Sequence, residues 1–226
     1  ECHWPYDTPP EDIRKALTET GLSMLGLNTV RGNVAAGETG LAALPGRTKD
    51  ARAAIDAALD YAHAIKARSV HVMAGTVPFE TGRAVFVENL RYACDTAAPL
   101  GIQILIEPLN RYDAPGYALA TTDQAEALIA DVGSPNLRLM FDCYHVQLMQ
   151  GDLTNQLKRL MPIIGHIQFA APPKRTRPDQ GEINYAHIFD VIADLGYHAP
   201  LGAEYRPDGP TEDSLGWMQS LARRQP

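Results

Sequence analysis

Short apolar runs alternate along this chain with longer segments of helical periodicity, and this alternation restricts the fold more than any other feature of the sequence. The short runs are rich in Val, Ile and Leu, which is typical of strands buried on both faces of a parallel sheet. The last run is the weakest candidate because it contains Pro200 and Gly202. The predicted strands are residues 23–28, 69–74, 102–107, 137–142, 163–168 and 200–204.

The segments between these runs repeat apolar residues at steps of three and four, as an amphipathic helix requires. The helix that starts at Thr122 has Asp123 and Glu126 near its beginning, where carboxylates suit the helix dipole. Gly196 is placed to end another helix in the left-handed conformation. The predicted helices are residues 11–20, 50–67, 83–98, a helix from Thr122, residues 184–195 and residues 211–224.

Strand–helix alternation without a linker predicts one α/β domain over residues 1–226, built on a parallel sheet. A closed (β/α)8 TIM barrel has eight strands and typically about 250 residues. The sequence shows six strands and a further strand end at residues 1–4. This count fits a barrel that lacks its first βα unit in the given sequence, and an open sheet of six or seven strands is the alternative.

The amino-acid composition restricts the kinds of binding partner that this chain can have. Hydrophobic residues make up 45% and charged residues 21% of the chain, as in soluble globular proteins. The net charge of −7 argues against nucleic acid or an anionic membrane as the main partner. Cys2, Cys94 and Cys143 are odd in number and widely spaced, which favours a reducing compartment. Since no secretory signal opens the sequence, we expect a cytoplasmic protein, and homo-oligomerisation is left open.

Four consecutive predicted strands end on an oxygen-bearing side chain: Glu107, Asp142, Gln168 and Glu204. The carboxyl ends of parallel strands lie at one edge of a sheet or barrel, so we expect these side chains to converge there. Carboxylate and amide oxygens are hard ligands that suit Mg²⁺ or Mn²⁺. The competing interpretation is that acidic residues after strands are helix N-caps, which is harder to sustain for all four together.

Other polar residues near these strand ends are candidates for substrate binding. His145 follows Asp142 closely and has an imidazole suited to orienting a substrate or moving a proton, unless it is a solvent-exposed residue of a helix start. Arg175 lies in a cationic loop after Gln168 and has a guanidinium suited to a substrate carboxylate, with plain solvation as the alternative. His71 lies within a predicted strand, where a histidine is more often part of the core. The glycine-rich segment 31–47 is either a lid or a flexible connection.

Seven segments together resemble the hydroxypyruvate isomerase family of the xylose-isomerase-like TIM barrels. They are NVAAGETGLAALPGR, VHVMAG, IEPLN, FDCYH, HIQFA, GEINY and GAEYRP, and they span nearly the whole chain. The resemblance implies an aldose–ketose isomerase that converts hydroxypyruvate to tartronate semialdehyde, or a 2-oxo-tetronate isomerase. It also implies one further βα unit before Glu1, so that the barrel domain is N-terminally incomplete in the given sequence.

The resemblance also assigns roles to residues. By motif, Glu107 and Glu204 are the catalytic acid/base pair, and both join Asp142 and Gln168 as ligands of a divalent metal ion, Mg²⁺ or Mn²⁺. His145 and Arg175 match positions that contact substrate in related sugar epimerases, and His71 is the third candidate substrate contact.

The residue types suit this chemistry on their own. Moving a carbonyl along a short chain requires a proton to leave one carbon and another to reach its neighbour, which two carboxylates can perform. A sugar 3-epimerase on the same barrel remains an alternative because it uses the same ligands. A three-zinc abasic-site endonuclease fits less well, since Gln168 replaces a preferred zinc ligand and the chain is acidic. A non-catalytic binding protein is the last alternative.

Overall fold

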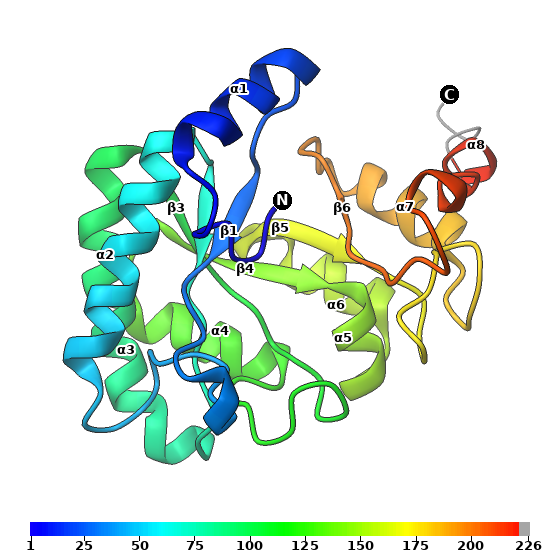
Figure 1. Cartoon of the computed structure of the whole chain (residues 1–226). Coiled ribbons are helices and arrows are strands. Elements are labelled where there is room, and N and C mark those ends of the chain that lie inside the picture. Colours follow the sequence, from blue (N-terminus) through cyan, green and yellow to red (C-terminus); the bar gives the residue numbers. More distant parts are fainter. Residues whose placement is uncertain (222–226) are drawn as a thin grey trace. The chain divides into compact units, whose positions relative to one another are not determined.

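The computed structural model describes residues 1–221 of the chain (Figure 1). The chain divides into two compact parts, of which the first is Glu1–Leu139 and the second begins at Met140. The strands follow one another in the sheet in the order of the chain, from β1 to β6. The one-domain expectation stays a prediction.

The sheet of the first part consists of parallel strands joined by helices. β1 (Gly26–Asn28), β2 (Ser69–His71) and β3 (Gln103–Ile106) are parallel neighbours, and β3 pairs with the beginning of β4 (Leu137–Asp142). The strand end expected at residues 1–4 lies beside β1. There the Cys2 N–H donates to the Gly26 carbonyl at 3.1 Å, and the Asn28 N–H donates to the His3 carbonyl at 2.9 Å.

The helices of the first part, except the first one, bury the apolar faces that their periodicity predicts. They are α1 (Pro10–Thr20), α2 (Thr48–Ile65), α3 (Phe79–Ala97) and α4 (Thr122–Val132), with single 3-10 turns at Val34–Ala36 and Ala98–Leu100. α4 begins with a capping box, in which the Thr121 side chain accepts from the Gln124 N–H and the Gln124 side chain accepts from the Thr121 N–H. It ends at Gly133 in the left-handed conformation, with φ of 70°.

The second part holds the rest of β4, then β5 (Ile164–Phe169) and β6 (Gly202–Ala203), which pair in parallel. Its helices are α5 (Cys143–Met149), α6 (Leu153–Leu160), α7 (Tyr185–Asp194) and α8 (Trp217–Leu221), with 3-10 turns at Met161–Ile163 and Glu212–Ser214. Phe169 packs against Tyr185, Phe189 and Trp217, with ring centroids 5.0 to 5.6 Å apart. This aromatic cluster is the core that supports the short strand β6.

The predicted strands all exist, and β4 has the predicted bounds. The C-terminal helix differs, because residues 211–221 form a 3-10 turn and a separate short helix instead of one continuous helix. The Ser214 hydroxyl donates to the Thr211 carbonyl at 2.6 Å and Gly216 follows, so the chain turns before α8 begins. The rest of that prediction lies outside the described residues. The sequence reading also missed α5 and α6.

Among the described residues, none of the helices combines the length and apolarity needed to cross a bilayer.

Candidate functional site

Glu107 lies in the interior of the first part, next to the sheet. It directly follows β3 and is buried, and its Oε2 lies 3.6 Å from Nδ1 of His71, the last residue of β2. This distance is longer than a hydrogen bond but short enough for a strong electrostatic contact when the imidazole is protonated. The structure therefore brings two sequence-predicted site residues, Glu107 and His71, together.

Asn110 fixes the loop that leads away from Glu107. Its Oδ1 accepts hydrogen bonds from the N–H groups of Tyr112 at 2.9 Å and Asp113 at 3.0 Å, while its Nδ2 donates to the Asp113 carboxylate at 3.1 Å. Asn110 is fully buried. The sequence reading quoted this residue in IEPLN without giving it a role. An Asn followed within three residues by Asp is a signal of such a side-chain-capped turn.

Tyr117 is a second residue that the sequence reading missed. Its hydroxyl oxygen accepts a hydrogen bond from the Ala74 N–H at 2.8 Å. Burial raises the pKa of Tyr117, the hydrogen bond from Ala74 lowers it in part, and the charge of Glu107 raises it further. Tyr117 therefore stays a neutral phenol near Glu107 at neutral pH.

Asp142 serves two purposes at the end of β4 in the second part. Its Oδ1 accepts a hydrogen bond from the Tyr144 N–H at 2.8 Å and caps α5, so the helix-cap interpretation is confirmed for this oxygen. Its Oδ2 instead lies 3.7 Å from Nε2 of His145. His145 is buried, so the solvent-exposed alternative for this histidine is wrong. The two carboxylate oxygens of Asp142 therefore have different surroundings, and only Oδ1 caps the helix.

Arg175 reaches across to two carboxylates of the second part. Its Nη2 lies 2.5 Å from Oε2 of Glu204 and 3.4 Å from Oδ2 of Asp142. Its Nε donates to the Glu204 carbonyl at 3.1 Å, and its guanidinium lies over the ring of Tyr144, 5.1 Å from the centroid. The alternative of a purely solvated arginine is therefore wrong.

Gln168 and Glu204 lie on the same face of the sheet. Side chains alternate along a strand, so Gln168 and Phe169 point to opposite faces, and Glu204 points away from Ala203 and Tyr205. Phe169, Ala203 and Tyr205 all line a cavity of about 1120 Å³ on the other face. Since Gln168 pairs in register with Gly202, two residues before Glu204, both polar side chains share the face opposite this cavity. His166, which the sequence reading passed over, is buried on β5 and shares the face of Gln168.

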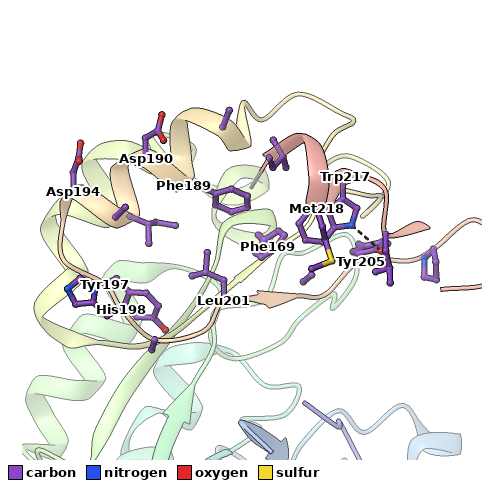
Figure 2. A pocket seen from close by; sticks show the side chains of 18 of the residues that line it. Phe169, Phe189, Asp190, Asp194, Tyr197, His198, Leu201, Tyr205, Trp217 and Met218 are labelled. Carbon is purple, nitrogen blue, oxygen red and sulfur yellow. Dashed lines mark hydrogen bonds between the residues drawn. The ribbon is translucent and has the colours of Figure 1, made fainter. Parts of the chain in front are cut away.

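The cavity itself is not the candidate site. Figure 2 shows Phe169, Phe189, Leu201 and Trp217 around it, with carboxylates of α7 at its edge. Its lining holds none of the side chains that the sequence reading selected for catalysis, metal binding or substrate binding. The cavity lies against the apolar faces of β5, β6 and α7.

The donor atoms of the candidate ligands are of the types that a divalent metal ion binds. Glu107, Asp142 and His145 are buried side chains whose oxygen and nitrogen atoms are compatible with such an ion. Gln168 adds a buried amide oxygen and Glu204 a further carboxylate. Oxygen donors with one imidazole suit a hard or intermediate ion such as Mg²⁺ or Mn²⁺ better than a thiolate-bound metal. Burial raises the pKa of Cys143, so its thiol stays protonated.

Part of the glycine-rich segment 31–47 is hydrogen-bonded to the residues that follow β2. The Ala42 and Ala43 N–H groups donate to the carbonyls of Met73 and Ala74 at 3.2 and 2.7 Å. Gly40 has φ of 139°, and a side chain there would meet the Met73 carbonyl at 2.5 Å. Residues 40–43 are therefore not a flexible connection, and the lid role stays a prediction.

Comparison with known proteins identifies the family. Residues 2–221 match the sequence profile of the family described as the xylose isomerase-like TIM barrel. The chain is 44% identical to the 2-oxo-tetronate isomerase of Cupriavidus necator over 228 residues, covering 99% of this chain and 88% of that protein. It is 40% identical to the hydroxypyruvate isomerase of Escherichia coli K12, covering 96% of this chain and 86% of that protein.

A solved structure gives the same fold. The crystal structure of a Brucella melitensis protein named AP endonuclease, family 2, superposes with a TM-score of 0.92 at 39% identity, covering 96% of this chain and 85% of that one. The family match and the parallel strand–helix alternation confirm the barrel fold class, with six strands among the described residues.

Proposed function

We propose that this chain, which belongs to the xylose isomerase-like TIM barrel family, is an aldose–ketose isomerase that acts on a small hydroxy-keto acid. Relatives with 40% to 44% identity over nearly the whole chain are named hydroxypyruvate isomerase and 2-oxo-tetronate isomerase, which supports the reaction type. The substrate is hydroxypyruvate or a 2-oxo-tetronate. A cytoplasmic location stays a prediction.

The position of the carboxylates carries this proposal. Glu107 follows β3, Asp142 ends β4 and Glu204 follows β6, so each lies at the carboxyl end of a parallel strand. β3 and β4 are parallel neighbours, so their carboxyl ends lie at one edge of the sheet. In barrels of this kind, this is the edge from which catalytic side chains project.

Two glutamates suffice for the proton transfers of the isomerisation. One carboxylate takes the proton from the carbon beside the carbonyl, and the substrate becomes an enediolate. The second carboxyl group delivers a proton to the neighbouring carbon while the hydroxyl proton passes to the former carbonyl oxygen, so that the carbonyl moves by one position. We assign these roles to Glu107 and Glu204. The isomerisation oxidises one carbon of the substrate and reduces its neighbour, so it needs no external oxidant or reductant.

Glu107, Asp142, Gln168 and Glu204 would hold a divalent metal ion, and His145 is a further donor of suitable type. When bound, the ion supplies Lewis-acid stabilisation of the negative charge that develops on the substrate oxygens. In this scheme, His145 and His71 orient the polar groups of the substrate, and Arg175 binds its carboxylate through paired N–H donors.

A direct assay tests the proposal. Hydroxypyruvate and a 2-oxo-tetronate are each incubated with the purified chain, and the aldehyde and keto isomers are separated and quantified. We expect conversion of at least one substrate, loss of conversion with a chelator, and recovery when Mg²⁺ or Mn²⁺ is returned. Failure to convert either acid in the presence of metal would overturn the proposal.

An abasic-site endonuclease is the second candidate, because the Brucella melitensis protein of the same fold carries that name. The formal net charge of −7 and the amide of Gln168 at a ligand position both disfavour it. Incubation with a duplex that contains one abasic site distinguishes the two functions. A sugar 3-epimerase would be recognised by conversion of a ketohexose, which is added to the first assay as a third substrate.

A further inference from the structure

We propose that Arg175 is a built-in counter-ion of the metal-binding carboxylates, and that a divalent cation displaces its guanidinium from Glu204 and Asp142. This inference rests on the proposed function, because it concerns the metal site of that function. It adds a role for Arg175 before any substrate arrives. The guanidinium stabilises the carboxylates without metal and lowers their affinity for it.

The contacts of the guanidinium support this role. Its Nη2 lies 2.5 Å from Oε2 of Glu204 and 3.4 Å from Oδ2 of Asp142, so one nitrogen lies near the oxygens of two carboxylates. The side chain of Asp142 is completely buried, while those of Arg175 and Glu204 keep exposed fractions of 16% and 21%. Two such carboxylates close to one another need a positive charge nearby.

The backbone aims Arg175 at this position. Ala171 and Thr176 exchange two backbone hydrogen bonds of 2.9 and 3.0 Å, which close a tight loop around Arg175. Arg175 has φ of 57°, a left-handed conformation that a non-glycine residue rarely adopts. Its carbonyl accepts from the Arg206 N–H at 2.7 Å. The loop geometry therefore holds the residue, and the side chain is not a surface arginine that happens to reach the site.

Competition follows from these contacts. A divalent cation on the same oxygens would lie close to the guanidinium, and two positive groups at that distance repel each other strongly where water is partly excluded. Metal binding to both carboxylates would therefore move the guanidinium away from Glu204 and Asp142. The guanidinium already lies over the ring of Tyr144, which can keep it near the site, and the released N–H donors are then available to an anionic substrate.

The experiment measures metal affinity and not activity. Mn²⁺ is titrated calorimetrically into wild-type protein, Arg175→Met, which removes the charge, and Arg175→Lys, which keeps it. Arg177→Met is the matched control, because Arg177 lies in the same loop and pairs with Asp179 away from the carboxylates. We expect Arg175→Met to bind Mn²⁺ on the order of tenfold more tightly than wild type, with Arg175→Lys near wild type.

Thermal unfolding without metal provides the second measurement. Arg175→Met should lower the unfolding temperature of the metal-free protein and increase the rise that Mn²⁺ produces, while Arg177→Met should change neither. Unchanged or weaker Mn²⁺ binding by Arg175→Met overturns the counter-ion role and leaves the isomerase proposal standing. Failure of the wild-type chain to bind Mn²⁺ overturns the proposed metal site itself, and the counter-ion role with it.

Discussion

Two glutamates that follow parallel strands are held in different ways in the two parts of the molecule. In the first part, Glu107 is buried beside His71 and Tyr117, and the loop beyond it is closed by the side chain of Asn110. In the second part, Glu204 follows a strand of two residues and remains 21% exposed. Its partner is the guanidinium of Arg175.

Glu107 is therefore positioned mainly by packing, whereas Glu204 is positioned mainly by its ion pair with Arg175. Glu107 is buried after a strand of the sheet, the Asn110 side chain closes the loop beyond it, and its contact with His71 is strong only when the imidazole is protonated. The contact of Glu204 with Arg175 depends on charge, so another cation can replace it. Glu204 is therefore the adjustable member of the pair, and the predictions below test this contrast from the largest expected effect to the smallest.

The largest effect should follow from removal of Phe169, because β6 is too short to hold Glu204 without packing. Phe169→Ala removes the centre of the aromatic cluster with Tyr185, Phe189 and Trp217. We expect a loss of about 3–5 kcal/mol in the free energy of unfolding, measured by urea denaturation.

Met218→Ala is the control for this change. Met218 lines the same cavity but is 50% exposed, so its truncation should cost less than about 0.5 kcal/mol. Equal losses from both variants would show that the cluster around Phe169 does not support the second part.

Charge-neutral replacement of the two glutamates should have the next largest effect. Glu107→Gln and Glu204→Gln keep the shape of each side chain and remove the group that transfers a proton. We expect each to lower kcat by on the order of 10²-fold or more, equal to about 2.7 kcal/mol in the barrier. Rates are measured with saturating Mn²⁺ and with Mn²⁺ binding checked separately.

Glu88→Gln is the control because Glu88 is an exposed glutamate of α3. Should either site variant keep near-normal turnover with metal bound, that residue is not part of the acid/base pair. A smaller fall for Glu204→Gln than for Glu107→Gln would sharpen the contrast, since the adjustable carboxylate would then be the less essential one.

Much of the fold follows from local sequence patterns. The run at Leu137–Asp142 ends where β4 ends, because a buried parallel strand must be apolar and its first polar residue marks the edge. The interruption of the C-terminal helix could not be predicted from local patterns. Its break depends on the Ser214 hydroxyl and on Tyr205, whose hydroxyl lies 2.5 Å from that of Ser214, and contacts of this kind are set by tertiary structure.

The residues of the candidate site were also selected from local patterns, and their roles stay predictions. Residue type and strand-end position select Glu107, Asp142 and Glu204, because parallel strands bring their carboxyl ends to one edge. The roles of Asn110 and Tyr117 could not be read in the same way. Both act through backbone groups of their loops, and Tyr117 bonds to Ala74, which is distant along the chain. Which carboxylate Arg175 contacts likewise depends on the left-handed turn that aims it.

A moderate effect is expected at the loop that fixes Glu107. Asn110→Ala empties a fully buried side-chain position and removes the acceptor of the Tyr112 and Asp113 N–H groups. We expect a loss of about 1–3 kcal/mol in the free energy of unfolding, measured by urea denaturation. Asn155→Ala is the control, since Asn155 donates to Asp152 at the surface and should cost less than about 0.5 kcal/mol. Equal stability of the two variants would mean that Glu107 does not depend on this loop.

The smallest effect concerns Glu38, a charge-held glutamate of the first part that is more open to water than Glu107. Its carboxylate accepts from the Asn33 N–H and from Arg47, both at 2.6 Å, and these contacts lower its pKa, the Asn33 hydrogen bond most. A lowered pKa in the folded state means that the contribution to stability is complete above the unfolded value of about 4.5 and is lost as pH falls through the folded value. Thermal unfolding of wild type and Glu38→Gln from pH 7 to pH 3 should therefore show a modest gap at pH 7 that closes below about pH 4.5. A gap that persists at pH 3 would show that Glu38 acts through its shape, and that charge does not hold this loop as it holds Glu204.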